Sequence, residues 1–104
     1  MARASVPREA AVVTRILAWL RELPQCRAVK NHGGAYGQAG EPDIHGSIGG
    51  RAFFIEVKRP DPRSQPTELQ KHVMQEWAAA GAIVGVARSL DDAKQLLVNH
   101  VPQV

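Results

Sequence analysis

A pair of glycines, Gly49 and Gly50, separates two short apolar segments and constrains the fold more than any other feature of the chain. Residues 43–48 precede the pair, and residues 51–58, which hold the most apolar run of the sequence, follow it. Two-residue glycine connections favour the tight turns that join antiparallel strands. The sequence therefore predicts that these two segments form a β-hairpin.

The segments around this hairpin carry helical and strand patterns in turn. Apolar residues recur with helical spacing from residue 8 until Pro24 ends the pattern, and a second helix is expected over 67–80. Ser89 is expected to cap a third helix. Two further short segments are expected to be strands, 26–32 and 83–87. The predicted order is α-β-β-β-α-β-α, an α/β fold with a mixed sheet flanked by helices.

The remaining segments are expected to be irregular. They are a lead over 1–7, a glycine-rich loop over 33–40 and a proline-rich loop over 59–66. The helix over 67–80 should turn an apolar stripe toward the core. This stripe is formed by Leu69, Val73, Trp77 and Ala80.

Length and composition narrow the class of protein. A chain of 104 residues is expected to form one domain over 1–104. Its 44% of hydrophobic and 22% of charged residues argue against disorder, collagen and coiled coil. No run approaches the roughly 18 apolar residues of a membrane span, and the N-terminus lacks a secretory pattern, so we expect a cytoplasmic protein. The single cysteine, Cys26, excludes an internal disulfide, and the net charge of +3 suits a polyanionic partner.

The residues that carry chemistry lie at the open end of the predicted hairpin. Side chains alternate in direction along a strand, so Glu56 and Lys58 are expected on the same face. Gly49 lies six residues after Asp43, and Gly50 lies six residues before Glu56. Antiparallel pairing around this turn places Asp43 nearly opposite Glu56. Two carboxylates and a lysine are thus expected to converge.

This arrangement suits hydrolysis of a phosphodiester bond. Two neighbouring carboxylates raise each other's pKa, and a divalent cation removes that conflict. An incomplete shell of oxygen ligands suits Mg²⁺, which keeps several waters and takes phosphate oxygens as further ligands. The ammonium of Lys58 can position the attacking water or stabilise charge in the transition state.

Several elements of the sequence resemble, in order, the pattern of the VRR-NUC (virus-type replication-repair nuclease) family of PD-(D/E)XK nucleases. These elements are a glutamate in the first helix, a Lys-Asn strand, Gly-x-Pro-Asp, Ile-Glu-Val-Lys and a glutamine on a later helix. In this chain they are Glu9, Lys30-Asn31, Gly40 to Asp43, Ile55 to Lys58 and Gln70. The resemblance covers nearly the whole chain and implies a restriction-endonuclease-like core.

The resemblance also implies roles for individual residues. Asp43, Glu56 and the backbone carbonyl of Val57 would bind Mg²⁺, with Mn²⁺ as a substitute, and Lys58 would handle the attacking water. Glu9 would be the extra ligand if two metal ions bind. Stand-alone proteins of this family, from bacteria and their viruses, are regarded as homodimers that cut branched DNA such as four-way junctions.

Each of these acidic residues also has a purely structural explanation. Glu56 and Lys58 could form a solvated ion pair on an exposed strand, and Asp43 could be a turn residue after a proline. Glu9 lies on the apolar stripe of its helix, where a carboxylate needs a partner or a metal. A glutamate in the first turn of a helix is, however, also favoured by the helix dipole.

The polar residues outside this group also have two explanations. Gln70 could contact phosphate or support the site, or it could form a capping box with Thr67. His32 and His45 lack the spacing of a structural zinc site and are expected to be solvated or to contact phosphate. The candidate nucleic-acid contacts, each of which could equally be a solvated side chain, are Lys30, Asn31, Arg59, Arg63 and Lys71.

The leading hypothesis is therefore a Mg²⁺- or Mn²⁺-dependent endonuclease that acts as a homodimer on branched DNA. One alternative is a nuclease of the same fold that cuts ordinary duplex DNA or RNA. Another is a non-catalytic module for DNA binding or assembly. An acidic pair would repel DNA in a module that only binds, unless a metal intervenes.

Overall fold

The computed structural model describes residues 7–32 and 38–102. The expected lead over 1–7 and the glycine-rich loop over 33–40 lie largely outside these ranges. The described helices and strands follow the predicted order α-β-β-β-α-β-α. They are α1 (Glu9–Glu22), β1 (Cys26–Lys30), β2 (Ile44–Ile48), β3 (Arg51–Val57), α2 (Glu68–Ala79), β4 (Ile83–Ala87) and α3 (Leu90–Leu97).

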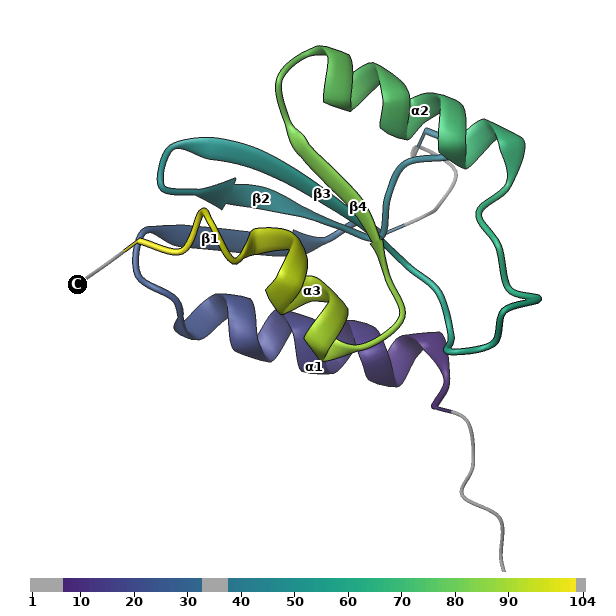
Figure 1. The fold of residues 1–104 in the computed structure, drawn as a ribbon, viewed down its shortest axis with the longest axis horizontal. Helices are drawn as coiled ribbons and strands as arrows, with labels where there is room; N and C mark the ends of the chain where they lie inside the picture. The colour runs from purple at the N-terminus through teal and green to yellow at the C-terminus, as the bar shows by residue number, and fades with distance from the viewer. Residues whose placement is uncertain (1–6, 33–37, 103–104) are drawn as a thin grey trace, which may run out of the picture.

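The strands form a single mixed sheet in the order β1-β2-β3-β4 (Figure 1). The first three strands pair antiparallel, and β4 pairs parallel with β3. Gly49 and Gly50 join β2 to β3 with φ angles of 56° and 85°, the left-handed values that a type I′ turn requires. The predicted hairpin and the mixed sheet are confirmed.

The register of the hairpin agrees with the count made from the sequence. Ile44 pairs with Ile55, and Ile48 pairs with Arg51 next to the turn. One further step along both strands places Asp43 opposite Glu56. The acidic pair therefore lies at the open end of the hairpin, where β2 begins and β3 ends.

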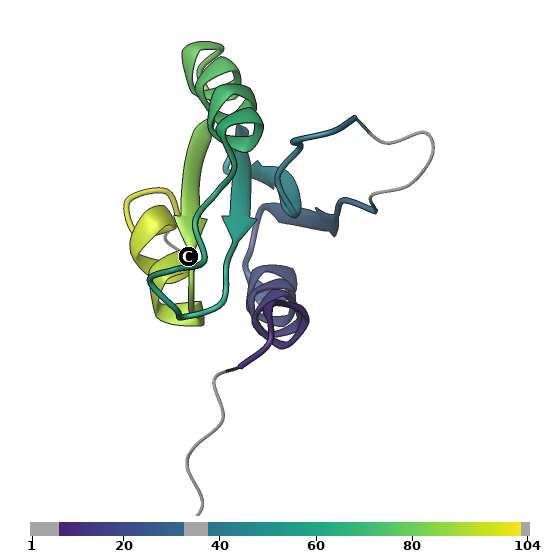
Figure 2. The same cartoon turned by 90° about the vertical axis from the view of Figure 1, so that its right-hand side faces the viewer.

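Helices α1 and α3 pack together on one face of the sheet, as Figures 1 and 2 show. The apolar residues of α1 recur every three or four positions, so they form one stripe that faces the strands. Between these helices and the sheet lies the core. Its most deeply buried large side chains include Ile16, Leu20, Ile44, Ile48, Phe53, Ile55, Val57 and Leu97.

Helix α2 lies apart from α1 and α3 and packs against β4 (Figure 2). The predicted inward stripe of this helix is confirmed only in part: Val73 and Trp77 are half-buried and Trp77 stacks on Phe54 of β3, whereas Leu69 is 49% exposed and no residue of α2 is fully buried. The physical reason is that α2 packs mainly against one strand, β4, which leaves part of the stripe exposed. Leu69 and Val73 contact the backbone at Gly40, where an added Cβ would come within 2.8 Å of the Leu69 side chain.

The described helices are short or interrupted by polar residues. None of them is long and apolar enough to cross a bilayer.

Candidate active site

Asp43 is held at the open end of the hairpin by the backbone of the neighbouring strand. Its Oδ2 accepts a hydrogen bond of 2.8 Å from the Val57 N–H. Strand β2 begins only at Ile44, so the carboxylate of Asp43 takes the place of a strand partner for this N–H group. The next N–H of the chain, that of Lys58, donates instead to the carbonyl of Ala87 at the end of β4. The strand ends are thus fixed on both sides.

Glu56 is the buried charged residue of the described chain, with 2% of its surface exposed. Among the described residues, its Oε2 has no hydrogen-bond partner. Burial, as the largest cause, and the adjacent carboxyl of Asp43 together raise the pKa of Glu56 from 4.5 to about 9. An unpartnered buried carboxyl oxygen is costly, and a native protein rarely keeps one without a reason.

Glu9 and Lys58 approach this acidic pair with opposite effects. Glu9, the first residue of α1, raises the pKa of Glu56 through its charge, whereas Lys58 lowers it. Both side chains are half-buried. Glu9 is near the pair, but the structure, over the residues it describes, gathers no three His, Cys, Asp or Glu side chains into a group that could hold a metal.

The donor set fits a hard divalent cation. The buried oxygen of Glu56 lacks a partner, and Asp43 lies opposite it on the neighbouring strand. Two carboxylates give an incomplete oxygen shell, which is the kind of site that Mg²⁺ occupies together with waters and substrate phosphates. Asp43, Glu56 and the carbonyl of Val57 are the groups that could hold such an ion.

Lys30 is the last residue of β1 and Asn31 follows it, so their side chains point to opposite faces of the sheet. The Asn31 N–H donates to the carbonyl of Asp43 at 2.7 Å, which continues the β1–β2 pairing by one residue. Asn31, Asp43 and Glu56 therefore form a row across three strands on one face. Lys30 pairs with Ile44, so its side chain points to the other face. The structure brings Asn31 to the acidic pair and does not bring Lys30 there.

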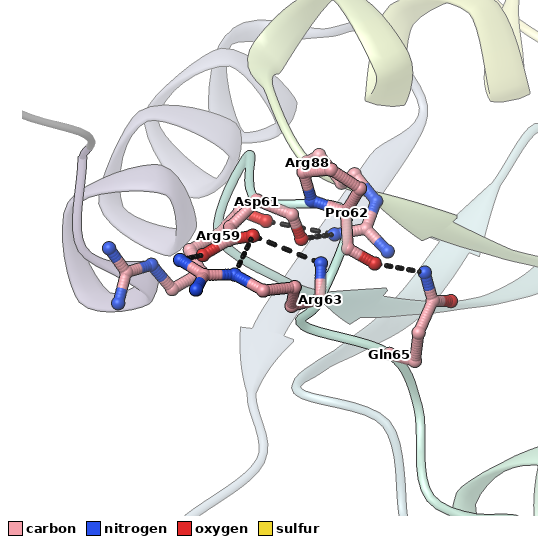
Figure 3. A network of polar contacts seen from close by, with 6 residues as sticks. All are labelled: Arg59, Asp61, Pro62, Arg63, Gln65 and Arg88. Atoms are coloured by element: carbon pink, nitrogen blue, oxygen red, sulfur yellow. Dashed lines mark hydrogen bonds and ion pairs between the residues drawn. The ribbon is translucent and has the colours of Figure 1, made fainter.

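Arg88, the residue that follows β4, holds the loop after Lys58 in place (Figure 3). The Arg88 Nη1 donates to the carbonyls of Arg59 and Asp61, each at 2.9 Å. Arg63 forms an exposed ion pair of 3.0 Å with Asp61, and this pairing lowers the pKa of Asp61 to about 2. Arg59 and Arg63, which the sequence analysis named as candidate nucleic-acid contacts, thus lie on the loop that follows β3 and that Arg88 holds in place.

Sequence reasoning missed Arg88. Its two acceptors lie 29 and 27 residues earlier in the chain, and no local pattern signals such a contact. The one available signal was its position directly after the buried segment 83–87.

Gln70 and Lys71 lie in the first turn of α2. The Gln70 Oε1 accepts from the Thr67 N–H at 2.8 Å, and the Gln70 N–H donates to the Thr67 hydroxyl at 3.1 Å. This is the capping box that the sequence offered as one explanation of Gln70. Lys71 forms an exposed ion pair of 3.2 Å with Glu68.

Comparison with known proteins identifies the architecture. No family model matches the sequence, and no curated protein matches it. A solved structure described as a "VRR_NUC domain protein" superposes with a TM-score of 0.75 at 21% identity, over 94% of this chain and 91% of that chain. A second, described as a "VRR_NUC domain", superposes with a TM-score of 0.70 at 23% identity, over 90% and 97%.

The chain has the VRR-NUC fold. The predicted restriction-endonuclease-like α/β architecture is confirmed. At this low identity the superposition establishes the fold of the chain, and the activity has to be argued from the site.

Proposed function

We propose that this VRR-NUC-fold protein is a divalent-metal-dependent endonuclease that hydrolyses phosphodiester bonds in DNA. The observation that carries the proposal is Glu56, a buried carboxyl with an unpartnered oxygen that lies beside Asp43. An ionised carboxyl pair in such a place destabilises the protein, so Glu56 either keeps a proton or shares a cation with Asp43. A phosphodiester substrate supplies the further oxygen ligands that two carboxylates leave open.

Each residue of the site has a separate role in the proposed reaction. Asp43, Glu56 and the Val57 carbonyl would hold Mg²⁺ or Mn²⁺, which when bound polarises the scissile phosphate and lowers the pKa of a water ligand. The Val57 N–H keeps Asp43 in place. Lys58 orients the attacking water, and its ammonium stabilises the negative charge that grows on the phosphate.

The substrate class follows from what surrounds the site. Arg59 lies on the loop after Lys58 and offers positive charge to the phosphates that flank the cleaved bond, whereas Arg63 would first have to leave its ion pair with Asp61. A domain of this size offers little surface to read base sequence, so we propose that it selects DNA by structure. Branched DNA, cut by a homodimer, is the substrate that the VRR-NUC resemblance favours.

A cleavage assay tests this function. Purified protein is incubated with labelled four-way junction, flap, single-stranded and linear duplex DNA, in MgCl₂, MnCl₂ or EDTA. We expect cleavage with either metal, none in EDTA, and a loss of roughly a hundredfold or more in Lys58→Ala. Lys94→Ala, which removes an exposed lysine of α3, is the matched control and should cleave normally.

Two outcomes would contradict the proposal. Folded protein that cuts none of the four substrates with either metal would not be a stand-alone nuclease. DNA affinity that is unaffected by EDTA and by Asp43→Ala would instead indicate a binding module.

A further inference from the structure

A small cavity lined by aromatic rings lies on the same face of the sheet as the acidic pair. Its volume is about 260 Å³, and its lining residues are Asn31, Glu41, His45, Phe54 and Trp77. Such a volume lies just below the range of sites for drug-sized ligands, as expected of a site for one planar group. None of the roles discussed so far requires this cavity.

The register of the hairpin fixes the place of this cavity relative to the acidic pair. His45 follows Asp43 by two residues, Phe54 precedes Glu56 by two, and His45 pairs with Phe54. Residues two apart on a strand share a face and lie about 7 Å apart. The cavity therefore begins one step along the hairpin from the two carboxylates. A nucleotide spans a distance of this order from its phosphate to its base.

Three rings in the cavity lie nearly parallel. The His45 and Phe54 rings are 5.8 Å apart with an angle of 21° between their planes, and the Phe54 and Trp77 rings are 3.9 Å apart with an angle of 19°. The Trp77 indole is held in place because its Nε1–H donates to Glu41 at 3.0 Å. Because Trp77 covers the buried ring of Phe54, the half-buried ring of His45 is the aromatic face left open to a nucleobase, which can stack on it.

Polar groups in the cavity suit the edge of a base. The side chain of Asn31 can both donate and accept hydrogen bonds, and the Glu41 carboxylate can accept from an exocyclic amino group. Beyond His45, a second hollow continues along β1 and β2 and exposes Arg27 and Ser47. Arg27 supplies positive charge for the backbone of a strand that leaves the cavity.

We propose that this aromatic cavity binds an unpaired nucleobase of the strand whose phosphate lies at the acidic pair. The inference rests on the proposed nuclease function and narrows its substrate to DNA that has an unpaired nucleotide next to the cleaved bond. Bases within an intact duplex are stacked and paired, so they reach such a cavity only at an unpairing cost of a few kcal/mol. Branch points and flaps present unpaired bases without that cost.

Equilibrium binding separates this cavity from general attraction to phosphate. The full chain with Lys58→Ala, used so that DNA is not cut, is titrated in MgCl₂ with a fluorescent 15-nucleotide single strand and with the same strand in a duplex. Adding His45→Ala should weaken single-strand binding by about five- to tenfold, the lower end of what stacking one base provides. Duplex affinity should change less than twofold.

Two further variants show whether the ring of His45 is what matters. His45→Phe keeps an aromatic face and should retain single-strand affinity. His72→Ala, which removes an exposed histidine of α2 outside the cavity, is the matched control and should bind as the parent does. A 2-aminopurine base in the strand should be quenched on binding by the parent and less so by His45→Ala.

The inference is overturned if His45→Ala leaves single-strand affinity unchanged or weakens duplex binding as much as single-strand binding. It is also overturned if His45→Phe weakens single-strand binding as much as His45→Ala does. The failure of the base site and the failure of the proposed nuclease function give different results. Ring-dependent binding of single strands by a protein that cuts no DNA would retain the base site and refute the enzyme. Metal-dependent cleavage with no effect of His45→Ala on binding would retain the enzyme and refute the base site.

Discussion

Glu56 is the residue on which the proposed metal site depends most. It is the last residue but one of β3, the most apolar strand of the sheet; it is buried, and its Oε2 has no hydrogen-bond partner in the described chain. Counting residues from the glycine turn predicted that it would face Asp43. Its burial could not be predicted, because both faces of β3 are covered near its end and sequence alternation described one apolar face only.

The free energy of unfolding of the metal-free protein should depend on pH through the ionisation of Glu56. Its pKa is raised from 4.5 to about 9 in the folded protein, so between these values the folded state binds a proton that the unfolded state has released. The metal-free protein should therefore lose stability as the pH rises from about 4.5 to 9, by at most about 1.4 kcal/mol per pH unit. Below this window both states are protonated and the effect vanishes.

Glu56→Gln isolates this contribution, because glutamine has a similar shape and does not ionise. The variant should match the parent near pH 4.5 and exceed its stability at pH 8, as measured by urea unfolding in EDTA. Equal stability of the two proteins at pH 8 would show that Glu56 is already ionised in the metal-free protein.

At the scale of elements, local signals were sufficient for the hairpin and insufficient for α2. The Gly49-Gly50 turn is a two-residue motif whose geometry follows from glycine's access to positive φ angles. The apolar stripe of α2 predicted a helix correctly, but a stripe does not say whether a second layer of structure covers it. Similarly, the contact of Arg88 with the loop after Lys58 joins segments that are distant in sequence.

The capping box of α2 provides a test of Gln70. Because its side-chain oxygen bonds the Thr67 N–H, Gln70→Ala and Thr67→Ala should each lower the free energy of unfolding by about 1 kcal/mol. The double variant should cost less than the sum, since both partners serve one motif. Urea unfolding of the four proteins measures this coupling.

The same variants show whether Gln70 also acts at the candidate active site. If the cap is its role, the two single variants should reduce cleavage to the same extent. A tenfold greater loss in Gln70→Ala than in Thr67→Ala would show that Gln70 contacts the substrate or supports the site.

At the scale of the whole molecule, the two faces of the sheet differ in which elements cover them. Helices α1 and α3 cover one face, and the core lies between these helices and the strands. The other face carries α2 beside β4, the row of Asn31, Asp43 and Glu56, and the aromatic cavity. Alternation along the strands predicted which residues share a face, whereas only the three-dimensional structure showed which face stays open.

The central claim is that Asp43 and Glu56 hold a divalent cation, and calorimetric titration with Mn²⁺ tests it most directly. The measurement is made at pH 7, in EDTA-free solution, in two buffers that differ in their heat of ionisation. Because Glu56 is protonated in the metal-free protein, binding should release about one proton and the observed heat should depend on the buffer. Glu56→Gln should bind at least about tenfold more weakly and release no proton. Absence of binding, or equal affinity and proton release in both proteins, would contradict the account.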